Sequence, residues 1–356
     1  MANELDTESV NTCLSAYPDL GGPYRFAALE GPFHNQLYQV RAPAGEFYLK
    51  VLTPHPVYAT EERYEYLASV MEHLAPLAVE LPLPIRNDRR RLLTACGSFR
   101  AELSRAIGGA PFEEGSPGHQ EAAGWTLGRF HQATRDLAPR GSSWVGPLGT
   151  YLLRDSSLLA VLPESREADA LREHFDELLD RCRRAAEDLC ALGAAALPRV
   201  IVHSEFTAKH LRMTAGKVSG ILDFEYTCRE TRCLDVAQAL RGLSCVGPAV
   251  GGYVQERVQA FIHGYQRAGW PLSPAECRAV SLAGEIWDLE CIGFWAHYMA
   301  QTADTHLDLD MVDHTRTHCG RADWWRGHRE ECAALLLTLT SREGAGRQAT
   351  GPPADS

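Results

Sequence analysis

The feature that most constrains the fold is a change of hydrophobic periodicity near residue 105. Before it, apolar and polar residues alternate in LYQV and FYLKV, and the turn sequence APAG between them predicts an antiparallel hairpin. Further strands are expected at residues 90–96 and 98–107, with one helix at residues 60–74 that ends before LPLPI. After residue 110, helical spacing dominates. The sequence therefore predicts an α+β chain, with expected helices in its second part at residues 120–133, 165–192, 235–242, 255–268, 274–302 and 324–339.

Length and composition describe a folded protein and exclude several classes of function. A chain of 356 residues exceeds the size of a single core, so we expect two lobes that share a cleft. The formal net charge of -11 repels nucleic acid and would attract a cationic acceptor. The start, MANELDTESV, lacks the features of a signal peptide, and no run reaches the roughly 18 apolar residues of a membrane span. We expect a cytoplasmic protein that contacts neither nucleic acid nor membrane.

The number and spacing of the cysteines indicate that they are reduced thiols. Their number, 11, is odd, and no CxxC pair occurs among them. A zinc site needs paired ligands at regular spacing, so buried apolar cysteine is the expected state of most of them.

Two acidic sequences follow predicted strands in the second part of the chain. One apolar strand ends in HSE at residues 203–205, and a later strand ends in DFE at residues 223–225. Carboxylates at neighbouring strand ends can hold a divalent metal and accept a proton from an attacking hydroxyl. These are tasks that phosphoryl transfer requires of a protein.

This segment resembles the aminoglycoside phosphotransferase family, the superfamily of choline and homoserine kinases, whose catalytic loop reads H-G-D-x-x-x-x-N before a D-F-E and a helix-starting Asp. His203, Asp223, Glu225 and Asp235 match that pattern. The resemblance implies that Asp223 ligates a magnesium ion on the ATP phosphates and that Asp235 braces the loop. Asp235 also fits a helix cap, and Glu225 fits either a metal-side acid or a salt-bridge partner.

The catalytic loop departs from the family at two positions. Glu205 stands where the family has its catalytic Asp, and His210 stands where it has a metal-holding Asn. The longer Glu205 side chain moves the carboxylate by about one bond length, and such shifts can change rates about a hundredfold. Imidazole is a poor ligand for Mg²⁺, so His210 indicates one metal ion, a Mn²⁺ preference or a phosphate contact.

Three stretches of the first part also resemble the family. Residues 31–40 resemble its nucleotide-covering loop, in which Gly31 and Asn35 are the candidate contacts. The last strand is expected to run into a hinge whose backbone meets the adenine, between Ser104 and Ile107.

The third stretch is FYLKVL, which supplies a strand lysine. The resemblance implies that Lys50 reaches the ATP phosphates and is held by a helix glutamate. Glu65 is the favoured partner, with Glu61 and Glu62 as alternatives.

The resemblance covers the chain from about residue 24 to residue 265 and implies a bilobal, protein kinase-like fold. The expected parts are a nucleotide-binding lobe at 1–103, a hinge at 104–109, a helical lobe with the acceptor site at 110–341, and a disordered tail at 342–356. The acidic sequence HLDLDMVDH at 306–314 is expected either to line a pocket for a cation or to be a solvated loop.

The expected function is an ATP-dependent kinase with Glu205 as the base that orients the acceptor hydroxyl and Asp223 as the metal ligand. The acceptor would be a small molecule, namely an antibiotic, an amino alcohol or an amino acid, or else Ser or Thr of a biosynthetic precursor peptide. The protein would be a monomer or homodimer. Two alternatives remain: a pseudokinase that binds nucleotide or peptide without transfer, and nucleotidyl transfer from a reoriented ATP.

Overall fold

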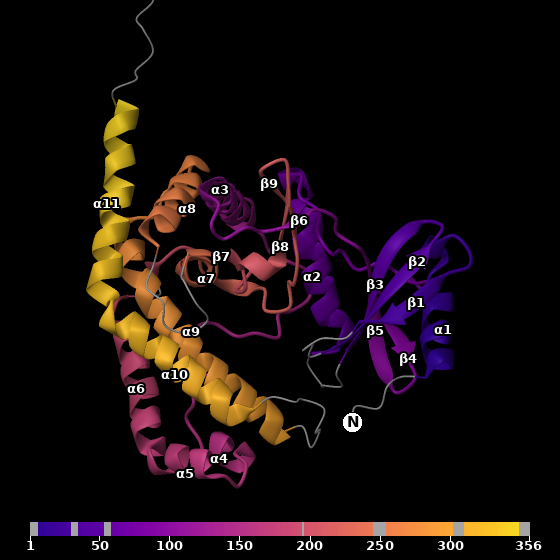
Figure 1. Cartoon of the computed structure of the whole chain (residues 1–356), viewed down its shortest axis with the longest axis horizontal. Helices are drawn as coiled ribbons and strands as arrows, with labels where there is room; N and C mark the ends of the chain where they lie inside the picture. Colours follow the sequence, from indigo (N-terminus) through magenta and orange to yellow (C-terminus); the bar gives the residue numbers. More distant parts are fainter. Residues whose placement is uncertain are drawn as a thin grey trace, which may run out of the picture.

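A computed structural model describes residues 6–29, 35–52, 58–193, 196–244, 254–301 and 310–348. These residues form a sheet-rich amino-terminal lobe and a larger helical lobe, which lie side by side in Figure 1. The predicted α+β class, an antiparallel sheet followed by mostly helical structure, is confirmed.

The amino-terminal lobe contains one five-stranded antiparallel sheet in the order β1-β2-β3-β5-β4. The predicted hairpin is β2 and β3, which close through the pair Ala42 and Gly45. Alternate residues of β3, among them Phe47 and Leu49, are buried, as the sequence pattern predicts. The strands are β1 (Arg25–Ala28), β2 (Gln36–Ala42), β3 (Gly45–Leu52), β4 (Thr94–Cys96) and β5 (Phe99–Arg105).

Two helices accompany the sheet. Helix α1 (Thr7–Ser15), for which the sequence analysis made no prediction, joins the core of the sheet through Val10 and Leu14. Helix α2 (Glu61–Leu74), close to its predicted bounds, starts at the capping residue Thr60. It packs with both lobes, because one of its faces belongs to the core of the helical lobe and another to a cluster under the sheet.

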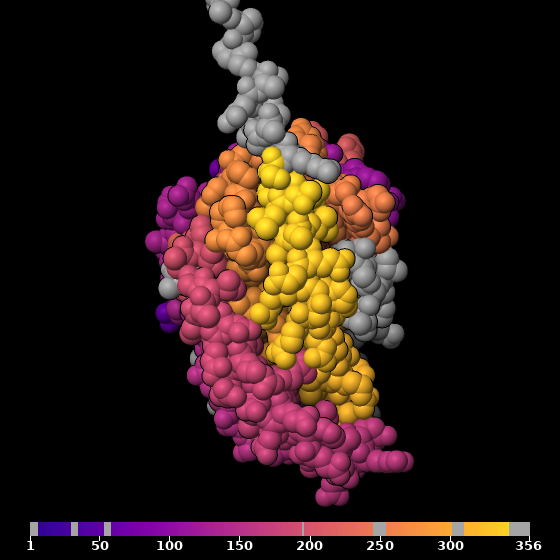
Figure 2. Space-filling view, turned by 90° about the vertical axis from the view of Figure 1, so that its left-hand side faces the viewer, coloured from indigo at the N-terminus to yellow at the C-terminus, as the bar shows by residue number. Residues whose placement is uncertain are grey.

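The helical lobe is built around α3, α7, α8 and α9, with two small sheets inserted between them. Figure 2 shows its outer face, over which α11 runs. The sheets are β7 (Arg199–Val202) with β10 (Cys228–Thr231), and β6 (Ala110–Pro111) with β8 (Leu211–Thr214) and β9 (Lys217–Ile221). The helices are α3 (Pro117–Thr134), α4 (Ser157–Val161), α5 (Arg166–Glu173), α6 (Phe175–Ala191), α7 (Cys233–Ser244), α8 (Gln255–Arg267), α9 (Pro274–Gln301), α10 (Met311–Gly327) and α11 (Arg329–Gln348).

Several predicted boundaries were wrong. The single helix expected at 165–192 is two helices, α5 and α6, which meet at His174, a residue with non-helical backbone angles. The helix expected at 324–339 is part of α10 and α11, which meet at His328. Helix α11 continues to residue 348, so residues 342–348 are helical rather than a disordered tail, and residues 349–356 lie outside the described part.

The acidic run at 306–314 falls partly outside the described residues, which resume at Asp310. Asp310 caps α10 by accepting the N–H groups of Val312 and Asp313. Met311 and Val312 are buried, so this end of the run is a helix start rather than a solvated loop.

The described cysteines are all free thiols, as predicted. Among the described residues, no helix combines the length and apolar character needed to cross a membrane.

Helices α3 and α8 approach each other closely at two glycines. A Cβ atom added to Gly124 would lie 1.9 Å from the carbonyl oxygen of Phe261, and one added to Gly264 would lie 2.0 Å from that of Glu121. These obstacles are backbone atoms, which cannot rotate away. The two helices must separate to admit even a methyl group.

We therefore expect Gly124→Ala to lower the free energy of unfolding by about 3 kcal/mol through overpacking. Gly118→Ala on the same helix is the matched control, because a Cβ added there would lie 3.9 Å from Ser116 Oγ, an ordinary van der Waals distance. That control should change stability by less than about 1 kcal/mol. Thermal and urea unfolding of both variants measure the difference, and equal stabilities would contradict the close-packing argument.

Candidate active site

The HSE and DFE sequences meet where the two lobes adjoin. Strand β7 leads into Ser204 and Glu205, and strand β9 leads into Asp223. Ser204 has φ 69° and Asp223 has φ 62°, both in the left-handed region. Non-glycine residues hold this conformation only where the surroundings compensate its cost.

Asp235 supplies that compensation for the first loop. Its fully buried carboxylate accepts the backbone N–H groups of His203 at 2.7 Å and Ser204 at 2.6 Å. It also contacts His131 Nε2 at 2.9 Å. Asp235 lies inside α7, which begins at Cys233, so it braces the loop as the resemblance predicts and the reading as a helix cap was wrong.

His203 connects the two loops through hydrogen bonds, and its ring is uncharged. Its Nε2 lies 2.8 Å from the carbonyl oxygen of Leu222, and its Nδ1 accepts the backbone N–H of Glu205 at 3.2 Å. Burial lowers the pKa of His203 to about 4, so the ring is neutral near pH 7. This agrees with a structural rather than a chemical role.

Glu205, His210 and Asp223 form one cluster, in which one ligand atom from each lies within 4.8 Å of the others. His210 Nδ1 contacts the carbonyl oxygen of Glu205 at 2.8 Å, and its Nε2 lies 3.2 Å from Asp223 Oδ2. Two carboxylates suit a divalent ion, and the imidazole suits Mn²⁺ better than Mg²⁺. The donor set therefore fits one metal ion held by Asp223 and His210.

The three groups influence one another's protonation. Burial and the charge of Asp223 raise the pKa of Glu205 to about 7. Burial also acts to raise the pKa of Asp223, but the hydrogen bond and charge of His210, with the charge of Lys50, hold it well below its usual range. The pKa of His210 is raised despite burial, because Asp223 bonds and attracts it. Asp223 and His210 thus shift each other's pKa in opposite directions, beside a carboxyl group whose pKa is about 7.

The prediction that Lys50 pairs with Glu65 was wrong. Lys50 Nζ lies 3.1 Å from Glu102, which stands opposite it on β5, and 2.6 Å from Glu225. Glu65 instead binds Arg86 at 2.7 Å. The two rivals are also engaged elsewhere, since Glu61 accepts backbone N–H groups of residues 92 and 93 and Glu62 accepts the hydroxyl of Ser142.

Glu225 joins the lobes and explains the position of Asn35. Its carboxylate accepts bonds from Lys50 at 2.6 Å, from Tyr58 at 2.6 Å and from Asn35 Nδ2 at 3.2 Å. Its backbone oxygen accepts Trp144 Nε1 at 2.6 Å. Asn35 therefore lies beside Glu225, the partner of Lys50, and its predicted contact with the nucleotide stays a prediction. Gly31, the other candidate contact, lies outside the described residues.

The expected hinge lies at the junction of the lobes. Ser104 is buried in β5, where its backbone pairs with Tyr48 and bridges Pro84. Ile107 packs on β9, because a Cβ at Gly220 would lie 2.3 Å from its Cγ2. The chain passes from one lobe to the other here, and the adenine contact stays a prediction.

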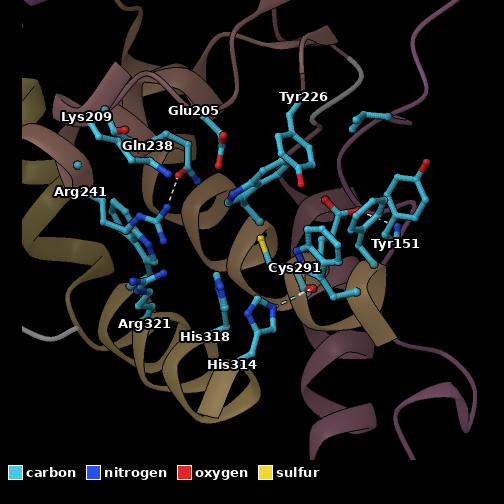
Figure 3. A pocket seen from close by; sticks show the side chains of 18 of the residues that line it. Tyr151, Glu205, Lys209, Tyr226, Gln238, Arg241, Cys291, His314, His318 and Arg321 are labelled. Atoms are coloured by element: carbon cyan, nitrogen blue, oxygen red, sulfur yellow. Dashed lines mark hydrogen bonds between the residues drawn. The ribbon is translucent and has the colours of Figure 1, made fainter. Parts of the chain in front are cut away.

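A cavity of about 710 Å³ opens beside Glu205 (Figure 3). Its walls come from the two loops, from α7, α9 and α10, and from residues 114, 145 and 151 on the segments that flank α3, all in the helical lobe. Glu205 was predicted from the sequence, but most of the other residues of this wall were not. One signal was available: Asp235, Gln238 and Arg241 are three residues apart on α7 and so share one helix face. Figure 3 shows Gln238 and Arg241 hydrogen bonded on the same side of the cavity.

Comparison with known proteins agrees with this geometry. Residues 25–272 match the phosphotransferase enzyme family. The chain is 26% identical over 277 residues to a homoserine kinase of Acidiphilium cryptum. The aligned region covers 78% of this chain and 82% of that kinase. Among solved structures, an amicoumacin kinase in complex with AMP-PNP and Ca²⁺ has TM-score 0.62 and 15% identity, covering 89% of this chain and 93% of that one. A choline/ethanolamine kinase family protein of Mesorhizobium loti has TM-score 0.57 and 18% identity, covering 93% and 98%.

The chain therefore belongs to the phosphotransferase enzyme family. The predicted protein kinase-like fold and the predicted phosphotransferase class are both confirmed.

Proposed function

We propose that this protein transfers the terminal phosphoryl group of ATP to a hydroxyl group of a small molecule. One observation carries the proposal: residues remote in the sequence converge between the lobes, beside a cavity. Lys50 bonds Glu225 at 2.6 Å, its charge lowers the pKa of Asp223, and Asp223 clusters with Glu205 at the cavity wall.

Each residue has a role that follows from its position. Lys50 would exchange Glu225 for a phosphate oxygen, because both are anionic partners of the same ammonium group. Asp223 and His210 would hold a divalent ion, Mg²⁺ or Mn²⁺, which when bound neutralises charge on the phosphates. Asn35 donates a hydrogen bond to Glu225 and would change partner when Lys50 exchanges Glu225 for phosphate. Phosphoryl transfer is mainly positioning and charge stabilisation, and this arrangement supplies both.

Glu205 would act on the acceptor. Its carboxylate accepts the hydroxyl proton while the hydroxyl oxygen forms a bond to the terminal phosphorus, and the bond from that phosphorus to the bridging oxygen of ADP breaks. The products are a phosphate ester, ADP and protonated Glu205. The pKa of about 7 suits a group that must both take up and release a proton near neutral pH.

The relatives support a small acceptor. The curated relatives include homoserine kinases, and chains of similar fold include an amicoumacin kinase and an aminopropanol kinase. A cavity of about 710 Å³ matches the usual size of small-molecule sites. We infer an amino acid, amino alcohol or antibiotic as acceptor in preference to a peptide side chain.

The test is acceptor-dependent ADP formation, with mass spectrometry of the product. Hydroxy amino acids, amino alcohols, aminoglycosides and Ser-containing peptides form the panel, each with Mg²⁺ or Mn²⁺, and nucleotide binding is measured separately. We expect a phosphate ester from at least one small acceptor. Nucleotide binding without any ester would reject the proposal and favour a pseudokinase, and transfer of AMP would favour the nucleotidyl alternative.

A further inference from the structure

The cavity beside the catalytic loop has two chemically different ends (Figure 3). Aromatic side chains, among them Tyr226 and Tyr151, line one end. Lys209, Arg241 and Arg321 lie at the opposite end. Glu205 stands between the two, so an acceptor that presents its hydroxyl to Glu205 can reach both.

Among the described residues, three basic side chains lie at this end of the cavity, and a buried carboxylate lies behind them. Asp288, buried behind the wall, bonds Arg241 at 2.8 Å and His318 at 2.8 Å. Burial lowers the pKa of His318, so this ring adds little positive charge near pH 7. Burial and the charge of Arg241 also lower the pKa of Arg321. Within the described part of the chain, Lys209, Arg241 and Arg321 line this end, and a negative group there would relieve the repulsion between Arg241 and Arg321.

Two uncharged donors lie at the same part of the wall. The Gln238 side chain is 1% exposed, and its Oε1 accepts from Arg241, which directs the amide nitrogen elsewhere. Within the described part of the chain, neither Gln238 Nε2 nor the hydroxyl of Thr207 has a hydrogen-bond partner. Buried donors without partners are costly, so these two point to a ligand that accepts hydrogen bonds.

Among the described residues, the acid at the aromatic end is Glu290, which does not supply a full negative charge for a cationic acceptor. Glu290, 4% exposed, accepts the backbone N–H of Tyr151 at 2.8 Å. Burial raises its pKa to about 8, so it is mostly uncharged near pH 7. Glu114 lies beside the carboxyl end of α7, since Gln120 Nε2 bonds its backbone oxygen and that of Leu243. The side chain of Glu114 is exposed, 3.7 Å from Arg257.

We propose that the acceptor carries an anionic group, a carboxylate or a phosphate monoester, which Lys209, Arg241 and Arg321 bind while its hydroxyl faces Glu205. The proposal rests on the proposed function and names the acceptor class for the same site. It differs from the cationic acceptor that net charge favours, because the local charge of a cavity governs what the cavity binds. Guanidinium groups suit both anions through paired hydrogen bonds.

Binding of four probes to the full chain tests this by calorimetry. The probes are 3-phenylpropanoate, its amide, 3-phenylpropylammonium and 2-phenylethyl phosphate, which share an aromatic body and differ mainly in charge. We expect one or both anions to bind about tenfold or more tighter than the amide, and the ammonium compound to bind most weakly. The tighter of the two anions identifies the carboxylate or the phosphate ester. AMP-PNP should not displace the anion.

Arg321→Gln should reduce anion binding to the level of the amide. Arg316→Gln on the same helix is the matched control, because Arg316 is exposed and does not line the cavity. Equal affinities for the probes, tightest binding of the ammonium compound, or no saturable binding at all would overturn the proposal. The measurement needs no turnover, so failure to form ADP would count against the proposed function alone.

Discussion

Asp223→Asn is expected to lower phosphoryl transfer about a thousandfold, because it removes the carboxylate that would hold the metal ion on the phosphates. Asparagine tolerates the left-handed backbone that Asp223 adopts, so the loop should keep its shape. Its oxygen can still accept a hydrogen bond from His210, which lies 3.2 Å from Asp223 Oδ2. The lost negative charge is therefore the main change.

Three measurements separate this effect from misfolding: initial rates, nucleotide titration and the unfolding temperature. Initial rates with Mg²⁺ and Mn²⁺ report transfer, and calorimetric titration with AMP-PNP in the presence and absence of metal reports coupling between ion and nucleotide. The variant should lose that coupling while its unfolding temperature changes little. Asp136→Asn, at an exposed position, is the control for the same chemical change. Metal-stimulated transfer within about tenfold of wild type would remove Asp223 as the principal ligand.

The sequence was sufficient for the elements whose patterns are local. The hairpin of β2 and β3 follows from alternation and its turn, and α2 follows from helical spacing and a capping threonine. The break at His174 was missed because no glycine or proline accompanies it. The break at His328 follows Gly327, a helix-ending signal that the prediction of one helix over 324–339 passed over.

The partner of Lys50 could not be predicted from the helix that carries Glu65. Three glutamates lie on α2 within one or two turns of each other, and the sequence does not show how the helix is rotated. In the structure, the face with Tyr64 and Ala68 meets the sheet, so Glu65 faces Arg86 instead. Glu102 was predictable in principle, because opposite charges placed directly across neighbouring strands attract.

The basic end of the cavity was hidden for another reason. Lys209, Arg241 and Arg321 come from a loop and from α7 and α10, and only packing of the helices brings them together. Net charge, which is -11 over the chain, has the opposite sign to this local cluster. The net charge of the whole chain does not describe this cavity, because the cavity walls contain only a few of the charged residues of the chain.

Glu205→Gln is expected to lower kcat about a hundredfold or more while nucleotide binding is kept, since the amide has the same shape but cannot accept the hydroxyl proton. The backbone of Glu205 is fixed on both sides, because its N–H bonds His203 and its carbonyl oxygen bonds His210. These contacts do not depend on the side-chain charge. The fold should therefore survive the change.

Glu205→Asp is the sharper comparison, because it keeps the charge and restores the residue type usual in the family. The anchored backbone cannot follow the shorter side chain, so the carboxylate should retreat by about one bond length and kcat should fall about tenfold or more. Wild type, Gln and Asp variants are compared in single-turnover transfer from ATP, with AMP-PNP affinity as the control. An Asp variant as fast as wild type would show that the site is not built around the longer acid. A Gln variant at full rate would exclude Glu205 as the base.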